Sequence, residues 1–142
     1  MAAALIRDED RFLILRRPAE GFLGGMWELP TTEIVSGETT ETRLLTAIET
    51  HTSIEAEKIC HITDIKHAYT HFKLRLSLFL VDTTGPSIPR LPHPEKRWIR
   101  LENIEEYPFH KAVHKCFPAI KKMIDQRIRC DQGAITYRPG AA

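Results

Sequence analysis

The chain has 142 residues, of which 42% are hydrophobic and 27% are charged, and it carries a formal net charge of +1 at pH 7. Its length suits a single domain with a core of ordinary globular composition. The small net charge excludes a strongly basic nucleic-acid binder, so any contact with DNA must depend on a local patch or on a partner domain.

The first 17 residues are predicted to form a β-hairpin, with strands at 3–7 and 11–17 around a polar turn at 8–10. Apolar side chains occupy both faces of the second strand, which is typical of a strand that is buried on two sides. A glycine-rich loop over 18–25 follows, and residues 26–30 are predicted to be a short, buried strand end.

A helix is predicted over 40–52. Thr39 or Thr40 can serve as its N-cap. Leu44 and Ile48 recur at helical spacing and give it one apolar stripe. Because several threonines lower the helix propensity of this segment, its stability must depend on packing.

Two antiparallel strands are predicted at 59–65 and 72–81, joined by a loop at 66–71. In the second strand, leucines alternate with charged side chains, which is the period of a strand with one buried face.

The last third of the chain is predicted to contain a proline-rich loop at 83–94, a short strand at 97–100, a helical turn at 101–107 and a helix at 112–127. Pro118 should interrupt or restart that last helix, because proline cannot donate a backbone hydrogen bond.

The order of these elements indicates an α/β fold in which a mixed β-sheet is sandwiched between α-helices. One domain is expected over 1–128. A loose C-terminal tail is expected over 129–142, where the sequence is polar and contains glycine.

The cysteines and the apolar segments bear on the setting of the protein. Cys60, Cys116 and Cys130 are widely spaced, which argues against a disulfide framework and against a structural zinc or iron–sulfur site. No apolar run approaches the roughly 18 residues of a membrane span, and the start is too short for a signal peptide. A cytoplasmic setting without a membrane partner is therefore expected by default.

Three stretches resemble one family of proteins. Residues 21–30 (GFLGGMWELP) are similar to the segment that leads into a Nudix box. Residues 66–71 (KHAYTH) resemble a loop, usually ending in F-S-H, in the C-terminal domain of MutY adenine DNA glycosylases. Residues 107–115 resemble the proline-bearing stretch that closes the same domain. The resemblance covers residues 2–125 and implies a Nudix fold.

The Nudix box itself, G-x5-E-x7-R-E-U-x-E-E-x-G-U, is degenerate in this register. Its nine fixed positions hold Thr32, Glu38, Thr46, Ala47, Ile48, Thr50, His51, Ser53 and Ile54. Thr46 and Ala47 replace the Arg-Glu pair, and Thr50 and His51 replace the Glu-Glu pair. Only Glu38 and the two isoleucines fit the pattern, and the isoleucines are packing residues. Since magnesium needs several oxygen ligands with matching charge, the sequence predicts a Nudix domain without a metal site and without catalytic residues.

The loop that resembles F-S-H is the candidate site for contact with DNA. The residues singled out in and beside it are Lys66, His67, Tyr69, Thr70, His71 and Lys73. In the family, the hydroxyl residue of this loop lies near the oxidised base, and Thr70 keeps that hydroxyl while adding a methyl group. The lysines and His67 would face phosphates, because base contacts need backbone contacts to hold their register. The alternative is an ordinary hairpin turn with a packed tyrosine and a solvated polar face.

The resemblance implies that the chain recognises 8-oxoguanine opposite adenine in double-stranded DNA, as part of an A/G-specific adenine glycosylase in base excision repair. An N-terminal glycosylase domain in cis would flip and excise the adenine. The catalytic acids and the iron–sulfur cluster would belong to that domain, and no cofactor is expected in this chain. The abrupt start inside a strand favours a fragment of such an enzyme over a stand-alone relative.

Two alternatives remain open. One is a divergent Nudix hydrolase that acts on a nucleoside diphosphate derivative and uses Glu38 with acids outside the box. The other is a Nudix scaffold that binds only protein. A helix-hairpin-helix glycosylase domain preceding residue 1 would favour the recognition domain over both.

Overall fold

The computed structural model describes residues 1–8, 10–21, 23–33, 39–52, 56–83 and 95–126. Its strands are β1 (Ala2–Asp8), β2 (Arg11–Arg16), β3 (Trp27–Glu28), β4 (Thr31–Thr32), β5 (Ala56–Ala68), β6 (Lys73–Thr83) and β7 (Lys96–Arg100). Its helices are α1 (Thr40–Thr52), the 3-10 helix η1 (Leu101–Glu106), α2 (Lys111–His114) and α3 (Phe117–Asp125).

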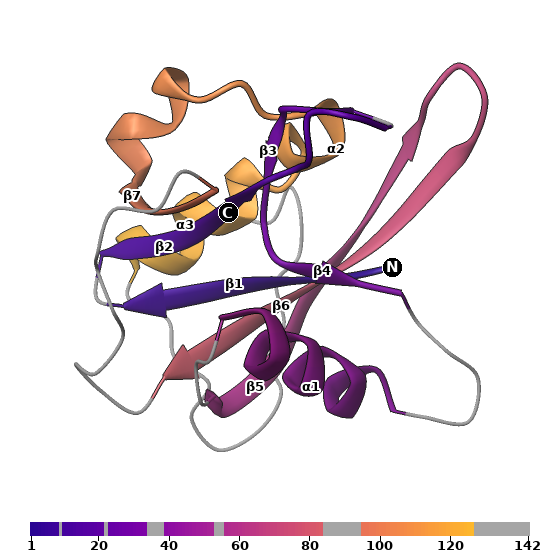
Figure 1. Ribbon diagram of the computed structural model, residues 1–142. Coiled ribbons are helices and arrows are strands. Elements are labelled where there is room, and N and C mark those ends of the chain that lie inside the picture. The colour runs from indigo at the N-terminus through magenta and orange to yellow at the C-terminus, as the bar shows by residue number, and fades with distance from the viewer. Residues whose placement is uncertain (9, 22, 34–38, 53–55, 84–94, 127–142) are drawn as a thin grey trace.

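The strands form one seven-stranded mixed sheet (Figure 1). The main path runs β3-β2-β1-β6-β5, while β4 pairs with β1 and β7 pairs with β2. Only the β1–β6 pairing is parallel among the described strands, and the other pairings are antiparallel. The predicted mixed sheet is therefore confirmed.

Each face of the sheet buries its own apolar cluster. Ala3, Leu5, Phe12 and Ile14 face a cluster that includes residues of α2 and α3. The alternate residues of β1 and β2 face the other cluster, which includes Leu44 and Ile48 of α1 (Ala2, Ala4, Ile6 and Leu13). The two layers of helices lie on opposite sides of the strands in Figure 1. The apolar side chains on both faces of the second strand predict burial on two sides, and the structure confirms it.

Both helix boundaries that depend on a particular residue are confirmed. Thr39 is the N-cap of α1, since its Oγ1 accepts a hydrogen bond from the backbone N–H of Thr42 at 3.2 Å. After α2 the chain restarts as α3 at Phe117, with Pro118 in the first turn, where no backbone donor is needed.

Two elements differ from expectation. β4 is too short for any periodic pattern in its sequence. β5 continues to Ala68, so Lys66 and His67 belong to a strand and not to a loop. The cause is pairing with β6, which supplies the backbone partners that an isolated polar segment lacks. The predicted proline-rich loop beyond Thr83 and the C-terminal tail lie outside the described residues.

Cys60 takes part in a disulfide bond, whereas Cys116 is a free, buried thiol. The expectation that the cysteines do not cross-link is therefore wrong at Cys60, because separation along the sequence does not measure separation in the folded chain. Burial raises the pKa of the Cys116 thiol to about 12, so it stays protonated and unreactive. None of the helices that the structure describes is long and apolar enough to cross a membrane.

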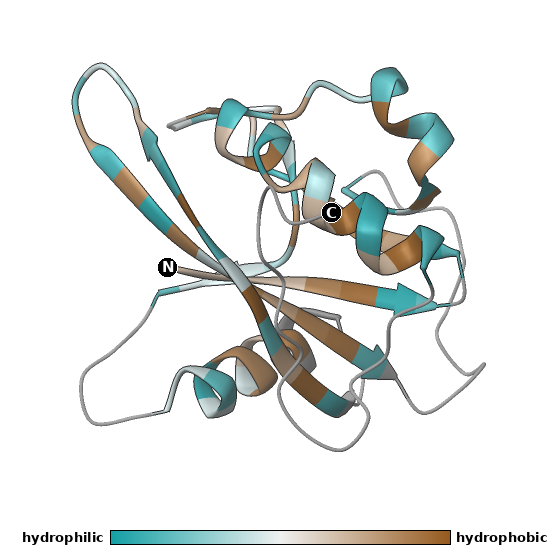
Figure 2. Cartoon of the chain, turned by 180° about the vertical axis from the view of Figure 1, so that it is seen from behind, coloured by the Kyte–Doolittle hydropathy of each residue, from teal (hydrophilic) through white to brown (hydrophobic). Residues whose placement is uncertain are grey.

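The β5–β6 hairpin projects beyond the body of the sheet (Figure 1). Its strands stay paired out to Ala68 and Lys73. Seen from behind in Figure 2, hydrophilic and hydrophobic residues alternate along the projecting part. A twisted two-stranded ribbon of this kind has two chemically different faces, and both end at the same tip.

Candidate functional site

The tip of the hairpin is a two-residue turn. The backbone N–H of Tyr69 donates to the carbonyl of Phe72 at 2.8 Å and closes the ladder. Thr70 and His71 form the turn, and both are exposed. The structure thus places the predicted hydroxyl residue at the outermost point of the projecting ribbon.

One face of the ribbon is basic. Lys66 lies opposite Arg75, and Lys73 lies opposite Ala68 in the next pair toward the tip that shares this face. The three cationic side chains are exposed. Like charges in opposite positions of a ladder repel each other, so an anion bound across them would relieve that repulsion. We call Lys66, Lys73 and Arg75 the basic face.

An acidic residue and a fourth cation frame the basic face. Lys115, which directly follows α2, donates its Nζ to the carbonyl of Lys66 at 2.9 Å and therefore lies beside β5. Asp64, farther from the tip, is hydrogen-bonded to His61 Nε2 at 2.8 Å. That bond, a second one from Ser77 and nearby positive charges hold the pKa of Asp64 below its usual value. The negative charge is therefore confined to the base of the projecting ribbon.

His67 does not share the face of the lysines. Its cross-strand partner is Leu74, its side chain is half-buried, and its ring lies edge-on to Tyr69 at 4.5 Å. Burial lowers the pKa of His67, and the charges of Lys115 and Lys111 lower it further. The imidazole is therefore neutral near pH 7 and contributes no cation to the basic face.

Tyr69 is held by two hydrogen bonds to the segment that begins α2. Its hydroxyl accepts from the backbone N–H of Ala112 at 3.2 Å and lies 3.0 Å from His110 Nδ1. The contact with Nδ1 suits either tautomer of His110, because a hydroxyl can donate or accept. The other ring nitrogen of His110, Nε2, lies 3.9 Å from Glu28 Oε1.

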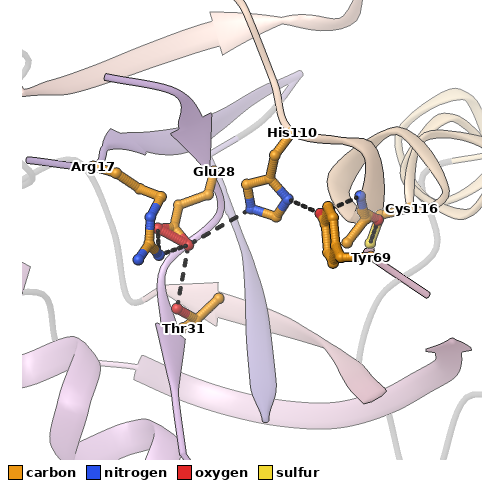
Figure 3. Close-up of polar contacts among 7 residues, drawn as sticks. Arg17, Glu28, Thr31, Tyr69, His110 and Cys116 are labelled. Carbon is orange, nitrogen blue, oxygen red and sulfur yellow. Dashed lines mark hydrogen bonds and ion pairs between the residues drawn. The ribbon is translucent and has the colours of Figure 1, made fainter. Parts of the chain in front are cut away.

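Glu28 extends the contacts into the sheet (Figure 3). Its side chain is only 11% exposed and lies 2.9 Å from Arg17 NH1. Thr31 Oγ1 approaches the other carboxylate oxygen at 3.5 Å. Arg17, Glu28, His110 and Tyr69 therefore form a partly buried polar chain that links the tip of the hairpin to β3, and within it Glu28 and His110 are the buried members. The sequence does not reveal this polar chain. Its members come from separate segments, and a local sequence pattern carries information only about the segment in which it occurs.

A cavity of about 90 Å³ separates the other face of the hairpin from this polar chain. Phe72, Leu74 and Leu76 line its apolar side. Arg17, Glu28 and His110 also line it. The hairpin thus presents cations on one face and a mostly apolar hollow on the other.

The positions of the degenerate Nudix box lie mostly on α1. Thr46 is exposed, and its Oγ1 donates back to the carbonyl of Thr42 at 3.0 Å. Ala47 is half-buried. Thr50 and His51 lie within α1, but their side chains are outside the described part, as is all of Glu38. Within the described ranges, no three His, Cys, Asp or Glu side chains are grouped so that they could hold a metal ion.

The sequence is similar to a known domain family and to two adenine DNA glycosylases. A family model described as "NUDIX domain" matches residues 1–119. The chain is 24% identical over 107 residues to adenine DNA glycosylase of Rattus norvegicus, covering 74% of this chain and 21% of that protein. The identity to the Homo sapiens enzyme is also 24%, over 109 residues that cover 75% of this chain and 20% of the other. The chain thus spans about a fifth of the curated relatives that it matches.

Solved structures show the same fold. The C-terminal domain of mouse MUTYH, in a complex with human PCNA, superimposes with a TM-score of 0.69 at 19% identity, over 93% of this chain and 92% of that one. Escherichia coli ORF135 gives 0.69 at 19% identity, over 89% and 90%. Shewanella oneidensis NrtR complexed with a 27mer DNA gives 0.72 at 13% identity, over 89% and 62%. The resemblance to the C-terminal domain of MutY glycosylases and the expected fold are both confirmed.

Proposed function

The chain belongs to the NUDIX domain family, and from this premise we propose that it recognises 8-oxoguanine in duplex DNA and does not hydrolyse pyrophosphates. The observation that carries the proposal is the projecting hairpin, which brings an exposed hydroxyl at Thr70 together with the basic face. The similarity to two adenine DNA glycosylases supports the choice of DNA as the ligand.

The basic face supplies the part of binding that does not depend on sequence. Lys66, Lys73 and Arg75 are exposed on one side of a ribbon that projects beyond the body of the sheet. Cations placed in this way contact phosphates and fix the orientation of the protein on the duplex. The overall charge of +1 is no obstacle, because the cations are concentrated locally.

Thr70 supplies the discrimination between oxidised and normal guanine. Oxidation at C8 gives the base a carbonyl at C8 and a proton at N7, so an acceptor edge becomes one that also donates. A hydroxyl both donates and accepts, and it can pair with either group. Tyr69 lies directly behind the turn, and its contacts with His110 and Ala112 limit the movement of the tip. His71, the other turn residue, is exposed beside Thr70 and is proposed to contact the DNA backbone.

The degenerate box supports a role without catalysis. Thr46 and Ala47 stand where the Nudix pattern has Arg and Glu, and Thr50 and His51 stand where it has two glutamates. Magnesium would have to be held by Glu38 with no second carboxylate at the fixed positions of the box, which does not fit the ligand set that the ion prefers.

The proposed partner in cis is an adenine glycosylase domain, because the chain corresponds to only about a fifth of its relatives. That domain would hold the catalytic acids and the iron–sulfur cluster and would excise the adenine opposite the lesion. We propose residues 1–128 as the recognition domain within such a protein.

The test compares three variants of a full-length glycosylase that carries this domain. Thr70→Ala should reduce the preference for 8-oxoguanine over guanine opposite adenine by about 2- to 13-fold, the value of one hydrogen bond. Thr70→Ser is the matched control, since it keeps the hydroxyl and should keep the preference. Lys73→Ala should weaken binding to both duplexes equally and reduce the salt slope by about 1. If Thr70→Ala leaves the lesion preference unchanged, the loop is only a turn and the assignment of Thr70 to lesion recognition is wrong.

A further inference from the structure

Phe72 is the one large hydrophobic side chain that the described residues leave exposed, with 40% of its surface open to solvent. It follows the turn residues Thr70 and His71 directly, and Lys73 comes next. An exposed phenylalanine at the end of a projecting ribbon does not contribute to the two buried clusters. Because Phe72 is exposed between a polar turn and a cation, its ring is positioned to contact a ligand that binds at the tip.

The ring of Phe72 is held in place from behind. It stacks on Tyr69 with ring centroids 5.2 Å apart and an interplanar angle of 27°. The hydroxyl of Tyr69 is bound by Ala112 and lies next to His110, so the supporting ring is itself fixed. A ring that is already ordered loses little conformational entropy when it contacts a ligand.

The two faces of the ribbon carry complementary chemistry at the same tip. The strand alternation puts Phe72 with Leu74 and Leu76, on the face opposite Lys73 and Arg75. A ribbon that approaches a duplex tip first would therefore direct cations toward one backbone and an aromatic ring toward the base stack.

We infer that Phe72 is a base-contacting platform whose ring stacks against a nucleobase adjacent to the lesion. The inference rests on the proposed function, which names duplex DNA as the ligand. It adds that the group contacted by Phe72 is a flat nucleobase. The charge of the neighbouring face favours a polyanion over a neutral or basic protein surface, and the similarity to adenine DNA glycosylases favours DNA among polyanions. Aromatic rings beside cations are the usual means of holding an unstacked base, because every base offers a π-face.

The experiment uses the full chain and duplexes in which 2-aminopurine replaces the base next to 8-oxoguanine. Binding of the unchanged chain should alter the fluorescence of 2-aminopurine, since its stacking changes. Phe72→Leu keeps an apolar side chain but removes the ring, and it should bind about 5- to 150-fold more weakly, the range for one base–aromatic stack. Its salt slope should not change, because no phosphate contact is lost.

Phe72→Trp is the matched control and should retain both affinity and the fluorescence change. Equal melting temperatures for the three proteins would show that the loss in Phe72→Leu is not a loss of folding. Equal binding by Phe72→Leu and the unchanged chain would overturn the inference while leaving lesion recognition intact, and the ring would then belong to a protein contact. If the unchanged chain binds neither the 8-oxoguanine duplex nor the guanine duplex, the proposed function fails together with the inference.

Discussion

Replacing Arg7 with alanine is expected to lower the free energy of unfolding by about 1–3 kcal/mol, the cost of leaving partly buried acceptors without their donor. Arg7 lies in β1 and is only 8% exposed. Its guanidinium is 3.0 Å from Asp82 of β6 and donates to the carbonyl of Met123 at 3.0 Å. Alanine would leave a carboxylate and a carbonyl at the end of α3 without this donor.

The measurement is urea unfolding of the full chain, with the slope m compared between variants so that a change in midpoint reports stability. Arg7→Lys is the matched control. It keeps the charge but loses the fork that reaches two acceptors at once, so its loss should be smaller. A loss below about 1 kcal/mol in Arg7→Ala would contradict the buried role, since that is the typical value of an exposed pair.

This contact matters for the site because α2 and α3 follow one another directly. α3 is tied to the sheet through Met123, and the segment before it carries His110 and Ala112, which hold Tyr69. We therefore expect Arg7→Ala to weaken DNA binding as well, at urea concentrations at which α3 no longer packs against the sheet.

No magnesium-dependent hydrolysis of 8-oxo-dGTP, dGTP or dinucleotide polyphosphates is expected. Enzymes accelerate such reactions by about 10⁶-fold or more, so the difference between a hydrolase and this chain should be unmistakable. The reason is the loss of paired carboxylates, since Thr50 and His51 occupy the positions of the two adjacent glutamates. Phosphate release and nucleotide products, measured with and without magnesium, provide the readout.

Two variants define the controls for this expectation. Thr50→Glu combined with His51→Glu restores the carboxylate pair and should raise the affinity for magnesium in calorimetry above that of the unchanged chain. Turnover by the unchanged chain that disappears in Glu38→Gln would contradict the recognition role and favour a divergent hydrolase.

The fold could be predicted largely because its signals are local. Apolar residues on both faces mark β2 and alternating leucines mark β6, while Thr39 caps α1 and Pro118 restarts the last helix. β5 was predicted too short because its last residues are polar, and only the partner strand keeps them extended. The disulfide at Cys60 could not be anticipated, since sequence spacing carries no information on spatial distance.

Only part of the candidate site could be predicted from the sequence. Resemblance pointed to the hairpin turn, and the structure brings Lys66, Lys73 and Thr70 onto one projecting ribbon. The partly buried polar chain from Glu28 through His110 to Tyr69 could not be predicted, because it joins segments far apart in sequence. His67 also differs from its sequence neighbours, since the strand turns it toward Tyr69 and away from the basic face.

The most direct test is the affinity of the chain for two duplexes that differ only in carrying 8-oxoguanine or guanine opposite adenine. Both are measured across one salt series, because contacts with phosphates are salt-dependent. The proposed role predicts tighter binding of the 8-oxoguanine duplex by about 2- to 13-fold, with equal salt slopes for the two. Equal affinities for the two duplexes at every salt concentration would contradict it.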